Sequence, residues 1–179
     1  MKCLYYLTAT LDRTRNITDD LHKAGIDDWF IHVLSKNEAG LKKNKIHSSN
    51  YWEQLDILRY GIIGAVAGCV AGLIAAGLVY STKPFGPELP GIVYCAIIAV
   101  LTLFGAWEGG LSGIASENKK TTLFHDDLEA GNYLIMVYAK QNFEHLITKI
   151  MKTQHPEAEL AAIDTSFYNP LTELKRINI

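Results

Sequence analysis

Two long uncharged stretches constrain this chain more than any other feature of its sequence. Gly61–Thr82 and Leu89–Trp107 contain no Asp, Glu, Lys or Arg, although 20% of the 179 residues are charged. A helix rises about 1.5 Å per residue, so roughly 20 apolar residues cross the hydrocarbon core of a bilayer. The pattern therefore predicts two membrane-spanning helices attached to a more polar domain.

The ends of the two spans predict a helical hairpin. The first span, Tyr60–Tyr80, has a tyrosine at each end, and aromatic side chains of this kind favour the membrane interface. The second span begins near Gly91 and continues to about Ala115. The connector between them is short and proline-rich, so the two helices are expected to run antiparallel.

The basic residues predict the orientation of this hairpin. Cytoplasmic flanks of membrane spans are enriched in Lys and Arg. The connector carries only Lys83, so both termini are expected on the cytoplasmic side. The basic residues on the terminal side of the spans are Lys42, Lys43, Lys45, Arg59, Lys119 and Lys120.

Both spans carry glycines at intervals of four residues, which places them on one face of each helix. Small residues let two helix backbones approach closely. The glycines therefore predict packing of the hairpin on itself, with Gly68 near Gly105, or a contact between subunits, and the two are compatible. In the first case Gly64 is also expected near Gly109. The six helix-packing candidates are Gly64, Gly68, Gly72, Gly105, Gly109 and Gly113.

Glu108 is the one acidic residue embedded in the second span. A charge at mid-bilayer costs at least about 2.5 kcal/mol, so such acids are candidates for function. Glu108 lies near the predicted cytoplasmic end, where it could instead reach lipid headgroups or Arg59. An ion path would need copies of Glu108 from several subunits, and both alternatives remain open.

The segment before the hairpin predicts a strand, a helix and a second strand. Lys2–Ala9 is rich in Tyr and Leu, and Asp12–Ala24 has its apolar residues on one helical face. Trp29–Ser35 has the composition of a second strand, and Lys36–Asn50 that of a polar loop. Tyr51–Tyr60 is expected to form a short helix at the membrane interface.

The same order follows the hairpin. Asn132–Ala139 is a nearly continuous apolar strand, and Gln141–Lys152 has the apolar face of a helix. Ala158–Phe167 is expected to contain a fourth strand. Asn169 and Pro170 suit the first positions of a short C-terminal helix. Its apolar stripe would consist of Leu171, Leu174 and Ile177.

Two β-α-β units predict a ferredoxin-like α+β sandwich, in which two helices cover one face of a four-stranded antiparallel sheet. Residues 1–60 would form the first half and the interfacial helix, residues 61–115 the transmembrane hairpin, and residues 116–179 the second half with the tail. The other sheet face would lack a cover within one chain. An uncovered apolar sheet face is most simply buried against a second copy of the chain, so the sequence predicts a homo-oligomer.

A histidine and three acidic residues gather before the third predicted strand. Carboxylates with an imidazole can bind a divalent metal, whereas acidic residues also stabilise the start of a short helix. Two isolated histidines, His32 and His155, are expected to be structural, although a histidine can change its charge near neutral pH. The candidate metal ligands are His125, Asp126, Asp127 and Glu129.

Composition argues against several classes of protein. A formal net charge of −2 without a basic block disfavours nucleic-acid binding. The three cysteines form no CxxC pair and are expected to be reduced in a cytoplasmic domain and its spans. No catalytic set or phosphate-binding loop can be placed from the spacing, so a non-enzymatic protein is expected. The sequence indicates no particular cofactor.

Several short motifs follow one another in a recognisable order. They are DLHKAGI, FIHVLS, a glycine-rich hairpin ending in FGAW, FHDDLEAGNYLIMVYA and a helix closing on HPEAE. In this order they resemble a family of small bacterial inner-membrane proteins of unknown function and, more distantly, bacterial general stress proteins. Some family members are automatically labelled as magnesium transporters. The resemblance implies a bacterial inner membrane and no catalytic residue.

A domain split by a hairpin predicts a sensor, regulatory or binding protein, and the resemblance implies a role in stress or ion homeostasis. Any ligand that shifts the packing of such a domain must also act on the two spans. The first alternative is an oligomeric channel or transporter for a divalent cation, with Glu108 at its inner mouth. The second is an accessory subunit of a larger membrane complex that presents Leu171–Ile177 to its partner.

Overall fold

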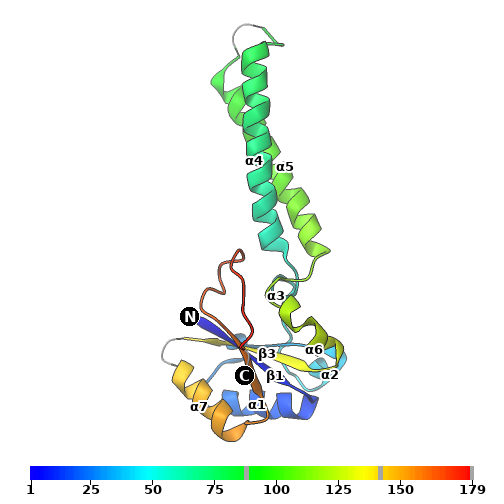
Figure 1. Cartoon of the computed structure of the whole chain (residues 1–179), viewed down its shortest axis with the longest axis vertical. Coiled ribbons are helices and arrows are strands. Elements are labelled where there is room, and N and C mark those ends of the chain that lie inside the picture. Colours follow the sequence, from blue (N-terminus) through cyan, green and yellow to red (C-terminus); the bar gives the residue numbers. More distant parts are fainter. Residues whose placement is uncertain (87–88, 141–142, 178–179) are drawn as a thin grey trace. The chain divides into compact units, whose positions relative to one another are not determined.

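The computed structural model describes residues 1–86, 89–140 and 143–177, and the chain divides into two compact units. One unit combines residues 1–54 with residues 119–179, and the other contains residues 55–118. Figure 1 shows the two units in one chain. Segments on both sides of the hairpin therefore build a single domain.

This domain contains a four-stranded antiparallel sheet in the order β2-β3-β1-β4. β1 (Lys2–Thr8) and β2 (Ile31–Leu34) precede the hairpin. β3 (Tyr133–Ala139) and β4 (Glu159–Asp164) follow it. β1 lies between β3 and β4, so the sheet forms only when both halves combine. The predicted α+β class and four-stranded antiparallel sheet are confirmed.

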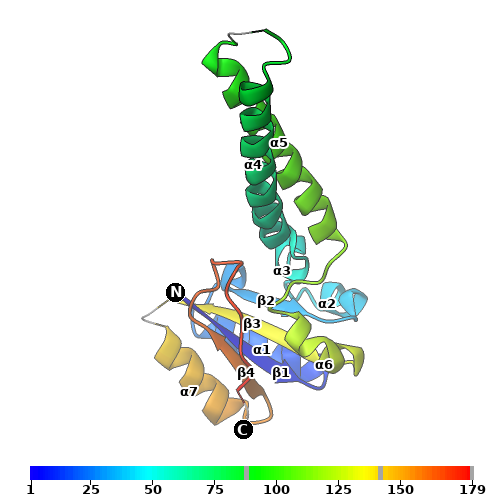
Figure 2. The ribbon, with the colours of Figure 1, turned by 45° about the horizontal axis from the view of Figure 1, so that its top comes forward.

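Two helices cover one face of the sheet (Figure 2). They are α1 (Leu11–Lys23) and α7 (Glu144–Gln154). Ile17 and Leu21 of α1 and Ile147 of α7 are fully buried in the core on this side. Burial of an aliphatic side chain of this size contributes about 1.5–3 kcal/mol, which explains the amphipathic spacing of both helices.

Later segments of the same chain cover the opposite face. Phe124 ends the short 3-10 helix η2 (Thr122–Phe124), is fully buried and stacks on Tyr5 with ring centroids 5.7 Å apart. Leu174, in the C-terminal segment, is buried in the same cluster. The prediction that this face needs a second copy is wrong, because η2 and the C-terminal segment already bury it.

Local structure differs from the predictions around β2 and α7. The predicted loop after β2 contains α2 (Glu38–Lys43), whose N-terminus is capped by Asn37 through a hydrogen bond from the Gly40 amide. Trp29 belongs to the 3-10 helix η1 (Asp28–Phe30), so β2 begins later than expected. The predicted helix start at Gln141 lies outside the described residues.

The predicted C-terminal helix does not form between residues 169 and 177. Asn169 Oδ1 accepts a hydrogen bond from the Leu171 amide at 2.9 Å, as expected of a capping side chain. The chain then continues through turns. Of the three predicted stripe residues, only Leu174 is buried.

The second unit is a pair of long helices, α4 (Ile57–Thr82) and α5 (Gly91–Ile114). Both are long and apolar enough to cross a membrane, as judged by length and composition. The predicted single helix Tyr51–Tyr60 is divided. Its first part is the single turn α3 (Tyr51–Gln54), and its second part begins α4.

Candidate functional site

A partly buried polar cluster brings together side chains from three elements of the domain. The Nδ1 of His32 on β2 lies 2.6 Å from the Oε1 of Glu53 on α3. The hydroxyl of Tyr138 on β3 donates to the same oxygen at 2.5 Å. The backbone amide of Asn50 donates to Glu53 Oε2 at 2.9 Å. Both carboxylate oxygens of Glu53 are therefore engaged, and α3 is fixed to the sheet.

His47 extends this cluster. Its ring lies 4.8 Å from the ring of His32, centroid to centroid, and its Nδ1 lies 4.0 Å from Asp28 Oδ2. The Nε2 atoms of His32 and His47 are both buried without a hydrogen-bond partner in the described part of the chain. A buried imidazole nitrogen with no hydrogen-bond partner is costly, so the packing around these two rings is a strained part of the cluster.

The electrostatics of the cluster favour an ionised Glu53. Burial acts to raise the pKa of Glu53, but hydrogen bonds from His32 and Tyr138 outweigh it and hold the pKa below its ordinary value of 4.5. Burial, together with the nearby Cys3 thiol and Glu53 carboxylate, raises the pKa of Tyr138. At neutral pH a charged acceptor therefore faces a protonated phenol.

Replacing Glu53 by glutamine is expected to flatten the acid side of the stability profile. Because the folded state lowers the pKa of Glu53, ionisation of this group stabilises the domain above about pH 4.5, and the stabilisation is lost as the pH falls below that value. Chemical unfolding of the full chain in micelles between pH 3 and pH 7 measures the effect. Equal pH dependence of the wild type and Glu53→Gln would contradict it.

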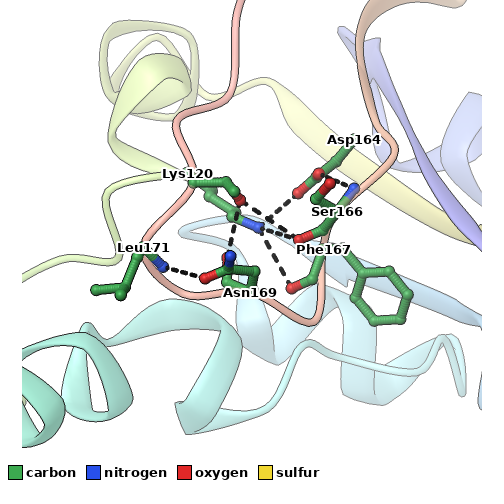
Figure 3. A network of polar contacts seen from close by, with 7 residues as sticks. Lys120, Asp164, Ser166, Phe167, Asn169 and Leu171 are labelled. Atoms are coloured by element: carbon green, nitrogen blue, oxygen red, sulfur yellow. Dashed lines mark hydrogen bonds and ion pairs between the residues drawn. The ribbon is translucent and has the colours of Figure 1, made fainter.

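A second buried network fastens the C-terminal segment (Figure 3). Lys120 Nζ lies 2.7 Å from Asp164 Oδ2 and also donates to the carbonyl oxygens of Ser166 and Phe167, each at 3.3 Å. Asp164 Oδ1 accepts from the Ser166 amide at 2.8 Å. Lys120 and Asp164 are both buried, so the ion pair holds the chain that follows β4 in one arrangement.

The structure places all six predicted packing glycines between α4 and α5. Gly64 and Gly105 lie so close that a Cβ on either would collide with the carbonyl oxygen of the other. A Cβ on Gly105 would lie 3.0 Å from the Cα of Gly68, and a Cβ on Gly64 would lie 3.1 Å from the Cα of Gly109. The glycines therefore pack the hairpin on itself, and a contact between subunits stays a prediction. The other two, Gly72 and Gly113, face Ile98 and Ile57.

Glu108 occupies an exposed position on α5. Arg59, its predicted partner, lies instead 3.7 Å from the carboxylate of Asp56. Backbone contact at the glycines fills the space between the described parts of α4 and α5. An ion path along Glu108 would therefore run between subunits, and it stays a prediction.

The predicted metal ligands lie on and around the short helix α6 (His125–Glu129). Glu129 pairs with Lys36, and Asp127 pairs with Arg176 at 2.9 Å. Within the described ranges, no group of three or more His, Cys, Asp or Glu side chains is placed to hold a metal ion. The geometry therefore lends no support to a metal site here.

His155 connects the ends of two helices. Its ring is buried at the end of α7, with Nε2 3.2 Å from Asp20 Oδ2 on α1 and Nδ1 3.4 Å from Glu157 Oε1. These contacts fit the expected structural role of this histidine.

Sequence reasoning singled out His32 but missed its partners. Glu53, Tyr138 and His47 come from separate segments, and only the folded sheet brings them together. The sequence carries a weak signal for the buried role of Asp164, because an acidic residue at the end of an apolar strand is a candidate for burial. No protein-family model matches the chain, and no curated protein matches it. The family resemblance stays a prediction, and the candidate function rests on the contacts above.

Proposed function

We propose that this chain is a non-enzymatic sensor or regulatory protein of the bacterial inner membrane. One observation carries the proposal: each of the two chain connections between the domain and the hairpin has a polar network at its domain end. Glu53 precedes Ile57, the first residue of α4, by four residues. Lys120 follows Ile114, the last residue of α5, by six residues. A change in either network alters how the chain enters or leaves the hairpin.

The fold of the domain supports a ferredoxin-like assignment. The order β2-β3-β1-β4, with α1 and α7 on one face, is the arrangement that two β-α-β units produce. In the proposal this domain lies in the cytoplasm with both termini, and α4 and α5 cross the membrane. The greater number of basic residues on the terminal side of the spans supports that orientation.

The coupling follows from the short distance along the chain. Only Leu55 and Asp56 separate α3 from α4. Loss of the contacts that Glu53 makes with His32 and Tyr138 would release α3 from the sheet and with it the start of α4. A ligand or proton that binds one state of the cluster better than the other would shift this equilibrium.

Self-association remains part of the proposal, but it now rests on Glu108 in α5 and not on an uncovered face of the sheet. Glu108 is exposed on an otherwise apolar helix, and such a carboxylate in a bilayer favours a position at the interface or against another subunit. The second candidate function, transport of a divalent cation, depends on the same feature. It requires several copies of Glu108 around one path.

Hydrogen exchange on the reconstituted full chain tests the coupling. Glu53→Gln is expected to speed amide exchange in α3 and in the first turn of α4, because it weakens the contact with His32 and Tyr138. Glu157→Gln is the matched control, since Glu157 also contacts a buried histidine but lies beyond the end of α7. Equal exchange at the start of α4 in the two variants would contradict the coupling.

A further inference from the structure

Two segments on one side of the sheet expose large apolar side chains. Tyr51 and Trp52 of α3 are 76% and 59% exposed. Tyr168 and Leu171, in the C-terminal loop after β4, are 73% and 52% exposed. Figures 1 and 2 show α3 and this loop on the side of the sheet opposite α1 and α7.

A series of contacts shows that the two segments are neighbours. The ring of Tyr168 lies 3.8 Å from the ring of Phe167, centroid to centroid, and Phe167 lies 5.0 Å from Tyr138. The hydroxyl of Tyr138 binds Glu53, the residue next to Trp52. The exposed residues of both segments therefore border one region of the surface.

Both segments are held firmly by the domain. Glu53 fixes α3 through His32 and Tyr138, and Lys120 fixes the loop through Asp164 and two backbone carbonyls (Figure 3). Exposed apolar side chains on a backbone that buried networks hold in place are typical of a binding surface.

We propose that Tyr51, Trp52, Tyr168 and Leu171 form a docking face that contacts the headgroup region of the membrane crossed by the hairpin. This inference rests on the proposed membrane location and adds a second contact with the bilayer. Trp52 precedes Ile57 by five residues, so it lies within about 17 Å of the start of α4 in any arrangement of the two units. Tyrosine and tryptophan favour this depth of a bilayer.

Charge complementarity also favours a lipid partner over a protein. Lys42, Lys43 and Lys45 are exposed on and just after α2, and the following segment reaches the same cluster through the contact of His47 with His32. Anionic lipids of a cytoplasmic leaflet attract lysines placed near the surface. These lysines belong to a segment that adjoins the polar cluster, so they can add electrostatic attraction to the apolar contact that the docking face makes.

The three tryptophans of the chain allow a direct test. Single-tryptophan variants of the full chain keep either Trp52 or Trp107, with Trp29 and the other tryptophan replaced by phenylalanine. A third variant carries Lys149→Trp, exposed on α7 at the opposite face of the sheet, in a chain with no other tryptophan. Each is reconstituted into vesicles of phosphatidylcholine and phosphatidylglycerol, with and without bromine on the acyl chains near the headgroup.

Trp107 in α5 reports insertion of the hairpin, and Trp52 reports docking. Brominated lipid is expected to quench Trp52 by at least half the fraction that it quenches Trp107, and to leave the Lys149→Trp reporter unquenched. Substituting Tyr168→Ser and Leu171→Ser is expected to lower the quenching of Trp52 and to leave that of Trp107 unchanged. An unchanged Trp52 signal in that double variant would exclude the loop from the face.

The remaining outcomes separate this inference from the proposed function. One outcome is that brominated lipid quenches Trp107 but not Trp52, while aqueous iodide quenches Trp52. This result would overturn docking and would leave the membrane location unchanged. Trp52 shielded from both bromine and iodide would mean that protein covers the face, which overturns the lipid assignment. Unquenched Trp107 would overturn the membrane location and docking together.

Discussion

Replacing Gly109 by leucine is expected to destabilise the hairpin by about 3 kcal/mol, because an overpacked contact forces the two helices apart. A Cβ at Gly109 would collide with the carbonyl oxygen of Tyr60 and lie 3.2 Å from the Cα of Gly64. Backbone atoms at this distance cannot move aside without shifting a whole helix. Titration with dodecyl sulfate in mixed micelles, followed by fluorescence of the full-length variant that keeps only Trp107, measures the loss.

Gly110 provides the matched control for this substitution. It is the next residue of the same helix, and a Cβ there would meet no atom within 4 Å. Both substitutions raise helix propensity by about 1 kcal/mol, so this contribution cancels when they are compared. The remaining difference in unfolding free energy measures the packing of α5 against α4 at Gly109. Equal destabilisation by Gly109→Leu and Gly110→Leu would contradict close helix contact at Gly109.

Replacing Lys120 by methionine is expected to cost the domain about 4 kcal/mol, because it leaves the buried carboxylate of Asp164 without its cation. Two carbonyl oxygens, those of Ser166 and Phe167, lose a donor in the same step. Urea unfolding of the full chain in micelles measures this loss.

The neighbouring lysine gives the control. Lys119 pairs with Glu173 on the surface, where both side chains are well exposed, so Lys119→Met is expected to change stability little. The double substitution Lys120→Met with Asp164→Asn is expected to recover much of the loss, since this site then buries no charge and the amide oxygen can still accept from the Ser166 amide. A loss after Lys120→Met no larger than that after Lys119→Met would show that the ion pair does not hold the loop.

Features governed by local pattern were predictable from the sequence. The two apolar helices follow from uninterrupted composition, and the contact of Gly68 with Gly105 follows from a spacing of four residues on antiparallel helices. The sheet follows from two β-α-β units in order. Each helix and strand is predicted from neighbours along the chain, and the order of the strands and helices then indicates how the distant strands pair.

Features that depend on contacts between distant segments were not predictable in the same way. The polar cluster needs the side chains of His32, Glu53 and Tyr138, which single-sequence patterns do not pair. The cover of the second sheet face was missed because Phe124 and Leu174 lie in segments without strong periodicity. Asn169 showed a capping signal, yet the Lys120 network fixes the loop beside it and no helix follows.

The strand order also determines when this domain can fold during synthesis. In the part of the chain that the structure describes, β1 pairs with β3 and β4, β2 pairs with β3, and the two early strands do not pair with each other. The first β-α-β segment therefore leaves the ribosome with no strand to join, and it must wait until both long helices have been made. If synthesis stopped within α4 or α5, the apolar β1 would stay unpaired and exposed to proteases. A folded domain therefore indicates that synthesis has continued beyond the hairpin.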